Sequence, residues 1–451
     1  MHFTLKNLSM LGFVAAMIFF LVVGVMAAGG KDYQALSLDD CLALAQEKNP
    51  TLGAARERVR ELVADYEAAR SQFFPKLTLI SYYQRLETDR LSPGGAATTQ
   101  NLFGREGLTS LTGKQIVFDG LQTYYNTKAA TLSRQAQHQE ITRTAEEVAF
   151  QVTEAFYRLL EAKEDVRVAK SALQERREFL EITEAFFRAG KVTRVDAFKA
   201  RSQVLEAEQG LVEAGNAVRL AQEILARTLG LEDKVQIDIR GKLPRALVAA
   251  PNFEALWQQT EKNNPEIKRL KLDLAQSQAL VKAAQGGYFP EVSLQGSVGV
   301  RHRDVGGTKD EWLGGVFMEF PFFEGGLTKA QVAKAASQYR QLLERQRDRL
   351  DALRVELMTG WKQQEDARKG VAASRQNLVA TQEAYQSALA LYRVGKAVGL
   401  DVLTAELELT RARLGLISYQ VAYEIGRAKV RQIIGGSAAE TEIKPRPGEG
   451  K

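Results

Sequence analysis

Side chains that could bind a metal or carry out catalysis are few in this chain of 451 residues and stand far apart. It has three histidines and one cysteine. A metal such as zinc needs several His, Cys or carboxylate ligands at close spacing. His2 lies at the extreme N-terminus, His138 falls in a polar helical stretch and His302 in an expected loop, each without a second ligand type nearby. We therefore predict no metal site and no cofactor.

Two glycine motifs resemble phosphate-binding loops only in part. Gly190-Lys191 could end a G-x-x-x-x-G-K loop, but the first glycine of that motif would fall on Ala185, and no strand pattern precedes it. The Gly-Gly pair at 325–326 follows a strand pattern but lacks G-x-G-x-x-G spacing. With neither motif complete, we predict that the protein is not an enzyme and assign no catalytic or cofactor-binding residue.

The Gly-Lys pair belongs instead to a turn that the chain contains twice. Residues 187–198 and 392–403 have the same pattern 205 positions apart: an aromatic-Arg run, a glycine, and an Asp about six residues later. Glycine suits a left-handed helix C-cap, and an Asp carboxylate suits the N-terminus of the next helix. Each segment is therefore a tight reversal between two helices.

Other markers repeat in the same order, so the whole unit is duplicated. An Asn-Pro pair is followed 25 residues later by an aromatic-Pro triplet in both halves, at 49–50 with 73–75 and at 264–265 with 288–290. Phe118-Asp119-Gly120 recurs near Phe323-Glu324-Gly325. The offset falls from 215 to 205 between these markers, which places the length difference in the loop between the two strands of each copy.

Each copy predicts the same series of elements. A short helix stops at Asn-Pro, a second helix follows, and the period then changes to two, as in a strand with one apolar face. A turn-rich loop, a second strand, a long helix, the Gly-Lys turn and a return helix complete the unit. In the first copy the two short helices are 38–48 and 51–72, the strands are 77–84 and 108–118 with the loop 88–107 between them, and the long helix is 121–187. In the second copy the first helix is 253–262, the strands are 292–300 and 311–322 with the loop 301–310 between them, and the long helix is 327–392.

The long and return helices carry apolar residues every seven positions, which is typical of helices that pack side by side. In the first copy the predicted seam comprises Val152, Leu159, Val166, Leu173, Leu180 and Phe187 of the long helix and Val204, Leu211, Val218 and Leu225 of the return helix. In the second copy it comprises Leu357, Gln364, Val371, Leu378, Tyr385 and Tyr392, then Leu409, Leu416, Tyr423 and Val430. The repetition in register predicts two equivalent helical hairpins.

The N-terminus has the charged, apolar and small-residue regions of a secretory signal peptide, which we assign to residues 1–28; retention as an anchor is the alternative. We divide the remainder into a first repeat (35–235), a linker (236–252), a second repeat (253–436) and a flexible tail (437–451). Cys41 cannot form an intrachain disulfide and is expected to be a small buried residue. The net charge of +6 is spread along helix faces, so we expect no nucleic-acid partner.

This duplicated unit behind a signal peptide resembles the TolC-like outer-membrane efflux proteins over residues 35–435. The resemblance implies a mainly α fold with a β-barrel contribution, in which three chains share a 12-stranded barrel and a coiled-coil helical tunnel. It implies a passive exit duct of a tripartite efflux or type I secretion system, in the outer membrane of a Gram-negative bacterium, with a periplasmic adaptor and an inner-membrane pump as partners. Oligomerisation also follows from the residues, because open strand edges are not tolerated in lipid.

The resemblance also suggests roles for single residues. It implies a periplasmic gate of Asp196, Tyr392 and Asp401, although the family's gate arginine falls on Ala397, its Thr partner on Val195 and its second luminal Asp on Thr404. Simple helix capping is the alternative for both aspartates. The implied adaptor-docking turns comprise Gly190, Lys191, Val192, Gly395, Lys396, Ala397, Val398, Gly399 and Leu400.

Aromatic residues gather where strand patterns meet helix patterns: Phe73, Phe74, Phe118, Tyr288, Phe289, Phe320, Phe322 and Phe323. We interpret them as an aromatic girdle against outer-membrane lipid, with ordinary packing at a sheet end as the alternative. Two other functions stay open. A periplasmic adaptor is also exported and coiled-coil but has one helical hairpin where this chain has two, and a soluble coiled-coil structural protein would lack the strands.

Overall fold

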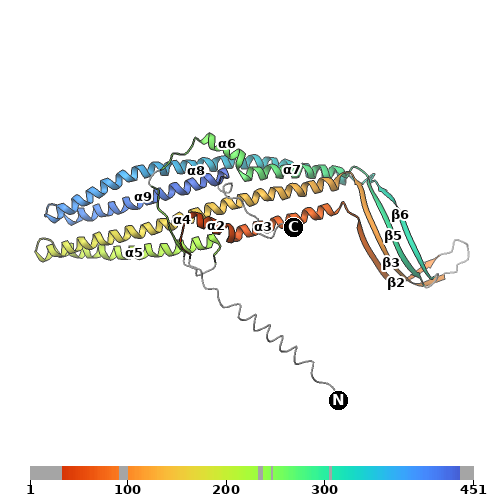
Figure 1. Cartoon of the computed structure of the whole chain (residues 1–451), viewed down its shortest axis with the longest axis horizontal. Helices are drawn as coiled ribbons and strands as arrows, with labels where there is room; N and C mark the ends of the chain where they lie inside the picture. Colours follow the sequence, from red (N-terminus) through yellow and green to blue (C-terminus); the bar gives the residue numbers. More distant parts are fainter. Residues whose placement is uncertain (1–32, 91–99, 232–236, 245–246, 304–306, 437–451) are drawn as a thin grey trace, which may run out of the picture. The chain divides into compact units, whose positions relative to one another are not determined.

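The computed structural model describes residues 33–90, 100–231, 237–244, 247–303 and 307–436. The expected signal peptide and C-terminal tail lie outside the described residues. The first copy contains β1 (Tyr33–Leu36), α2 (Leu38–Lys48), α3 (Pro50–Ser71), β2 (Lys76–Arg90), β3 (Gln100–Asp119), α4 (Gln122–Arg188) and α5 (Arg194–Leu229). After β4 (Ile237–Ile239), the second copy contains α6 (Phe253–Asn263), α7 (Pro265–Gly286), β5 (Glu291–Arg303), β6 (Gly307–Glu319), α8 (Leu327–Arg393) and α9 (Gly399–Ile434) (Figure 1).

The helices of the two copies begin and end at matching positions. Helices α6 and α7 start 215 residues after α2 and α3, and α8 and α9 start 205 residues after α4 and α5, with equal lengths in each pair. The two long helices have 67 residues each, which corresponds to about 100 Å at the rise of an α-helix. The predicted helices are therefore confirmed to within a residue or two.

The strands differ more from the prediction. All four pair in one antiparallel sheet in the order β2-β3-β5-β6. The expected loops 88–107 and 301–310 are wrong where the structure describes them, because β3 already begins at Gln100, β5 continues to Arg303 and β6 begins at Gly307. Their middle parts, 91–99 and 304–306, lie outside the described residues. His302 consequently lies in a strand and not in a loop. Cross-strand hydrogen bonding continues past glycine and threonine residues that, read locally, favour turns.

By internal contacts, the chain divides into two compact units, each of which takes segments from both copies. The first comprises Met1–Asn49, Val148–Ala249 and Gln363–Ala428, and the second comprises Pro50–Glu147, Ala250–Lys362 and Lys429–Lys451. Each unit has its own core. In the second unit α6 packs Phe253, Leu256 and Trp257 against Leu353 and Leu357 of α8, with Ile267, Val430 and Ile433 completing the cluster.

The heptad seam is confirmed along most of its length. Val152, Leu159 and Leu357 are fully buried, and Tyr385 and Tyr392 are nearly so. The prediction is wrong at Phe187, which is 42% exposed. This residue lies one position before α4 ends, so no further turn of helix continues the seam beyond it. Cys41 is fully buried in α2, as expected.

The Asn-Pro markers hold helix ends together in both copies. Asn49 Nδ2 donates to the carbonyl oxygen of Thr228 at 2.8 Å, and Asn264 Nδ2 donates to that of Ile433 at 2.7 Å. Gly230 and Gly435 follow the acceptor helices with φ angles of +75° and +81°. A Cβ at Gly230 would lie 2.4 Å from the Lys48 carbonyl oxygen, so only glycine fits this approach.

Candidate functional site

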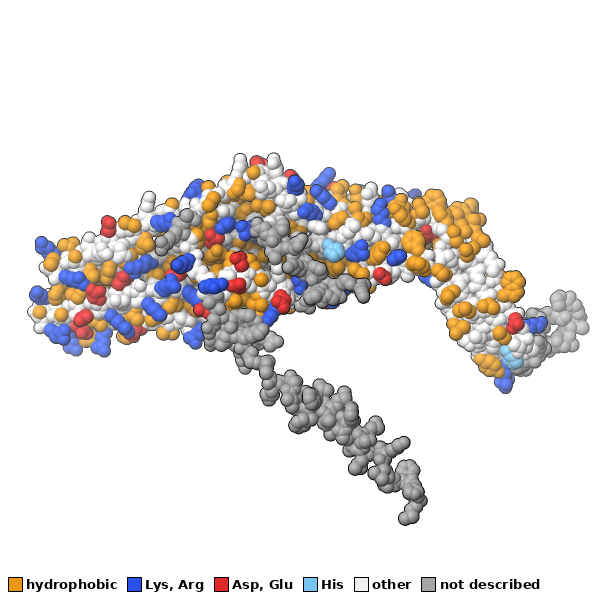
Figure 2. All heavy atoms as spheres, viewed as in Figure 1, with side chains coloured by type: hydrophobic (Ala, Val, Ile, Leu, Met, Phe, Trp, Pro, Cys, Tyr) orange, Lys and Arg blue, Asp and Glu red, His pale blue; other side chains and the backbone are white. Residues whose placement is uncertain are grey.

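The four-stranded sheet exposes one face that is largely apolar. Residues paired directly across an antiparallel sheet share a face, and the register places Leu79, Leu111, Val298 and Trp312 in one such row. Neighbouring rows on this face add Leu77, Leu294, Val300, Val316 and Met318, and all nine residues are 43–83% exposed. Figure 2 shows hydrophobic side chains along the sheet, most densely where it meets the helices. So large an apolar surface is expected to be covered in the working protein.

The opposite face of the sheet is mainly polar and carries ion pairs. Lys114 Nζ lies 2.7 Å from Glu291 Oε1. Farther along the strands, Arg301 bridges Glu106 and Glu311, with Nε 2.6 Å from Glu311 Oε1. These charges come from β3, β5 and β6, so the polar face is tied together across three strands. A sheet with one apolar and one charged face suits a boundary between lipid and water.

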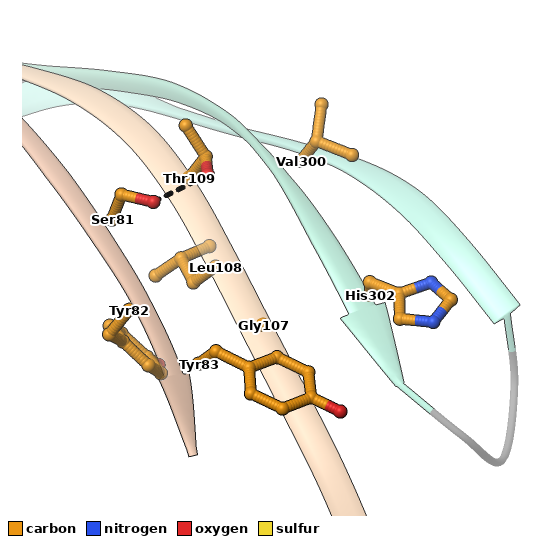
Figure 3. A pocket seen from close by; sticks show the side chains of 8 residues that line it. All are labelled: Ser81, Tyr82, Tyr83, Gly107, Leu108, Thr109, Val300 and His302. Atoms are coloured by element: carbon orange, nitrogen blue, oxygen red, sulfur yellow. Dashed lines mark hydrogen bonds between the residues drawn. The ribbon is translucent and has the colours of Figure 1, made fainter.

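Tyr83 packs on the apolar face against a glycine of the neighbouring strand. Its ring lies over Gly107 in the next strand, where a Cβ would come within 3.3 Å of the ring (Figure 3). Ser81 Oγ and Thr109 Oγ1 are hydrogen-bonded at 2.9 Å one row away. These residues, with Val300 and His302, line an open hollow of about 400 Å³. Gly107 is thus a packing partner of Tyr83 in mid-strand and not the turn residue that its type suggested.

The eight predicted girdle aromatics all lie at junctions between strands and helices, and all are exposed. Phe73 and Phe74 stand between α3 and β2, and Tyr288 and Phe289 between α7 and β5. Phe118 is near the end of β3, and the remaining three, Phe320, Phe322 and Phe323, connect β6 to α8. Their exposed fractions run from 38% to 90%. Their exposure favours the girdle over ordinary packing within the chain, although the role itself stays a prediction.

The two Gly-Lys turns have the same backbone geometry. Gly190 and Gly395 have φ angles of +69° and +74°. Lys191 N donates to Phe186 O at 2.9 Å, and Lys396 N donates to Leu391 O at the same distance. These are the bonds of a helix that ends in a left-handed glycine. No atom of the described residues lies within 4 Å of a Cβ built at either glycine, so both turn tips have room for a side chain.

Both aspartates begin return helices, as the capping alternative proposed. Asp196 Oδ2 accepts from Thr193 N at 3.0 Å and from Thr193 Oγ1 at 2.7 Å, which completes a capping box on α5. These hydrogen bonds hold the pKa of the Asp196 carboxyl below its usual value. Asp401 Oδ2 accepts from Val398 N at 3.3 Å. Capping is therefore present at both positions, and it leaves a gate role untested.

Tyr392 is buried, with only 4% of its surface exposed. Its ring packs at 5.2 Å from Phe179 and 5.5 Å from Phe186, measured between ring centroids. The Tyr392 hydroxyl lies 3.2 Å from Thr183 Oγ1. The structure thus brings Tyr392 onto α4, while the carboxylate of Asp196 bonds to its own helix N-terminus. Gly399 of the second turn also packs closely against this cluster, because a Cβ at this position would lie 3.1 Å from the Phe179 ring.

The predicted docking turns are accompanied by exposed apolar residues that the sequence reasoning missed. Among the predicted residues, Val398 and Leu400 are 63% and 71% exposed, whereas Ala397 packs at the edge of the Tyr392 cluster. The missed residues are Val195, Phe198, Leu391 and Val394, which are 46–67% exposed. A signal was available, because all four lie outside the heptad seam although they are apolar.

Ion pairs between α4 and α9 join the two hairpins of the first compact unit. Arg176 Nε lies 3.0 Å from Glu406 Oε2, and both side chains are nearly buried. Arg413 Nη2 lies 2.9 Å from Glu175 Oε1, about two turns farther along α9. The sequence could not pair these residues, because they are more than 200 positions apart. Nearer the turn, Arg393 pairs with Glu178.

Features of other protein classes are scarce in the described residues. No group of three or more His, Cys, Asp or Glu side chains within them is placed to hold a metal ion. Searched over the same residues, the chain has no helix that is both long and apolar enough to cross a membrane.

The family model of the outer membrane efflux proteins matches residues 41–231 and 256–436, which together cover both copies. This chain belongs to the outer membrane efflux protein family. The outer membrane efflux protein BepC of Brucella suis is 25% identical over 386 residues, which cover 84% of this chain and 81% of the relative. The cobalt-zinc-cadmium resistance protein CzcC of Cupriavidus metallidurans is 27% identical and covers 66% of this chain and 71% of its own length.

Solved structures agree on the fold of this outer membrane efflux protein. The outer-membrane channel OprN superposes with a TM-score of 0.79 at 20% identity, over 88% of this chain and 90% of that one. The predicted fold class and family resemblance are therefore confirmed. The protein is an outer-membrane channel component of an efflux system that extends into the periplasm, and its family is one of transport proteins.

Proposed function

We propose that three copies of this chain form a passive exit duct, to which an inner-membrane pump delivers cargo through a periplasmic adaptor. No catalysis by the duct is needed in this scheme, since the pump supplies the energy. The duct would serve a tripartite efflux or type I secretion system. We also propose that the two repeats, 35–235 and 253–436, contribute equivalent parts of its wall, with 236–252 as the linker.

The observation that carries the proposal is the open sheet with two unlike faces. Strands β2 and β6 form its edges, with 15 and 13 residues respectively. Backbone groups on such edges cannot be left unpaired in lipid. Pairing β2 of one copy with β6 of the next satisfies both edges, puts the apolar face outward and turns the polar face toward a water-filled lumen. Three copies give twelve strands, between the eight of a filled barrel and the sixteen of an open porin.

Cross-linking of the two edges tests the assembly directly. Cys41 is fully buried, and burial raises the pKa of its thiol to about 12, so it is expected to stay unreactive. Cysteines introduced at exposed positions of β2 and β6 are then the only reactive thiols. We expect cross-linked dimers and trimers in outer-membrane fractions, and a native mass of three chains. A native monomer without β2–β6 cross-links would contradict the proposal.

We further propose that Asp196, Tyr392 and Asp401 lie near the periplasmic aperture and that the two Gly-Lys turns dock the adaptor. The open tips at Gly190 and Gly395 and the exposed Val398 and Leu400 support the docking role. Replacing Asp401 with Asn should lower the preference for cations in planar-bilayer recordings if its carboxylate faces the lumen. Unchanged selectivity would refute that placement of Asp401.

A periplasmic adaptor is the second candidate that the sequence left open. The fold disfavours it, because the chain has two equivalent helical hairpins and four strands in one sheet. The cross-linking experiment above separates the two, since an adaptor would show no β2–β6 contact between copies.

A further inference from the structure

A groove beside the girdle aromatics has a composition that packing alone does not explain. It lies between the end of α3 and the start of α4 in the second compact unit and has a volume of about 560 Å³. Aromatic and cationic side chains dominate its lining. Tyr66 and Arg70 of α3, with Phe73 just after that helix, face Tyr124 and Lys128 of α4. Thr127 Oγ1 donates to Ala69 O at 3.3 Å and ties the two helices together below it.

The two cations that line the groove, Arg70 and Lys128, form no ion pair with any carboxylate of the described residues. The Arg70 guanidinium lies near the ring of Phe74, with Cζ 5.9 Å from the ring centroid. Arg134, deeper along α4, lies over the Tyr66 ring at 4.9 Å. Arg70 and Lys128 are both exposed, so the groove offers two uncompensated positive charges.

The second copy of the repeat lacks this composition. At the positions that correspond to Tyr66, Arg70, Tyr124 and Lys128, the second copy has Val281, Gln285, Lys329 and Ala333. The same helices meet the same sheet in both copies, so the fold does not require the aromatic and cationic set. The shared fold therefore does not account for the presence of this set in one copy only.

We propose that this groove binds the phosphate headgroup of an anionic phospholipid in the periplasmic leaflet of the outer membrane. The inference rests on the proposed function, which puts the strands in the membrane and the aromatics at its boundary. Arg70 is in the last turn of α3, and Lys128 is about 9 Å into α4 by helix rise, so both reach the headgroup layer. The aromatic rings lie beside the glycerol and upper acyl chains, and the two cations pair with the phosphate.

Lipid binding to the assembled full-length protein tests the proposal. Phosphatidylglycerol and phosphatidylcholine are titrated separately into the wild type and into an Arg70→Gln/Lys128→Gln double variant, and native mass spectrometry measures how much of each lipid binds. We expect the wild type to prefer phosphatidylglycerol by about ten-fold, from two cations near an anionic headgroup, and the variant to lose the preference. Lys329→Gln/Lys334→Gln, which removes two exposed cations from the start of α8, is the matched control and should keep it.

Several outcomes would overturn the proposal. The double variant could keep the preference, the matched control could lose it equally, or inorganic phosphate could displace the lipid at equal concentration, which would indicate a site for small anions. Arg70→Lys and Lys128→Arg keep the charge and should retain binding if the loss in the double variant is electrostatic and not a folding defect. Trimer formation and β2–β6 cross-linking are measured on the same samples, so failure of the lipid site is distinguishable from failure of the channel proposal.

Discussion

Asp165 lies in α4, where its surroundings disfavour the charged form of its carboxyl group. Burial within α4, together with the neighbouring carboxylates of Glu161 and Glu164, raises its pKa to about 6 from an ordinary 3.8. Because the folded-state pKa is above the unfolded one, Asp165 destabilises the folded protein at neutral pH. The cost disappears as the pH falls from about 6 toward 4.

Replacing Asp165 with Asn is therefore expected to stabilise the protein at pH 7.5 by about 1–2 kcal/mol, allowing for partial solvent screening. At pH 4 the effect should vanish, since the native side chain is then neutral. Apparent melting temperatures of variant and wild type at both pH values measure this, with the exposed Asp351→Asn as control. An equal shift at both pH values would mean that the amide acts through packing and not through charge.

At the scale of elements, one asparagine in each copy joins the ends of helices. Asn264 Oδ1 also accepts from Ile267 N at 3.0 Å, so this side chain both caps α7 and binds the end of α9. Asn264→Ala leaves two buried backbone groups unpaired and should cost about 2–3 kcal/mol. Asn264→Asp keeps the cap but places a carboxylate against the Ile433 carbonyl.

Hydrogen exchange at Ile267 separates the two roles of Asn264. The Asp variant should keep the protection of this amide, while both variants should speed exchange at the end of α9. If Asn264→Ala leaves both sites protected, the Asn-Pro marker reflects helix termination by Pro265 alone.

At Gly190 and Gly395 there is room for a side chain, so a substitution there is strained only by the positive φ of the backbone. Gly395→Asn should be tolerated, since Asn adopts positive φ, whereas Gly395→Val should cost at least about 1 kcal/mol in the hairpin. Trypsin cleavage at Lys396 should accelerate in the Val variant. We expect Gly395→Val to impair export while trimers still form. Loss of trimers would show that the glycine is needed for folding, and the docking role would lose its support.

At the scale of the whole molecule, the three tryptophans report on membrane placement. Trp312 is 83% exposed on the apolar face of the sheet, whereas Trp257 is buried in the helical core and the indole of Trp361 donates to Pro251 O at 3.0 Å. Brominated lipids quench tryptophan on contact, so quenching of the wild type should come mainly from Trp312. Trp312→Phe should abolish most of it. Quenching that persists in this variant would contradict the outward orientation of the apolar face.

Local periodicity was sufficient to predict the helices and the duplication. A heptad seam and a helix end depend on residues within a few turns of each other, so Val152, Leu159 and the glycines of both turns could be placed from their spacing alone. The alternation of Val298 and Val300 with polar neighbours likewise identified a strand with one apolar face. The family resemblance was readable because these local marks recur in the same order.

Contacts between distant segments were decided only by the tertiary structure. Strand length depends on a partner strand, so the continuation of β3 through Gly107 required Tyr83 and His302 beside it. The burial of Tyr392 against Thr183 and the pairing of Arg176 with Glu406 join residues more than 200 positions apart. The cationic groove needed α3 and α4 side by side. In each case the deciding energy comes from neighbours that the local pattern does not contain.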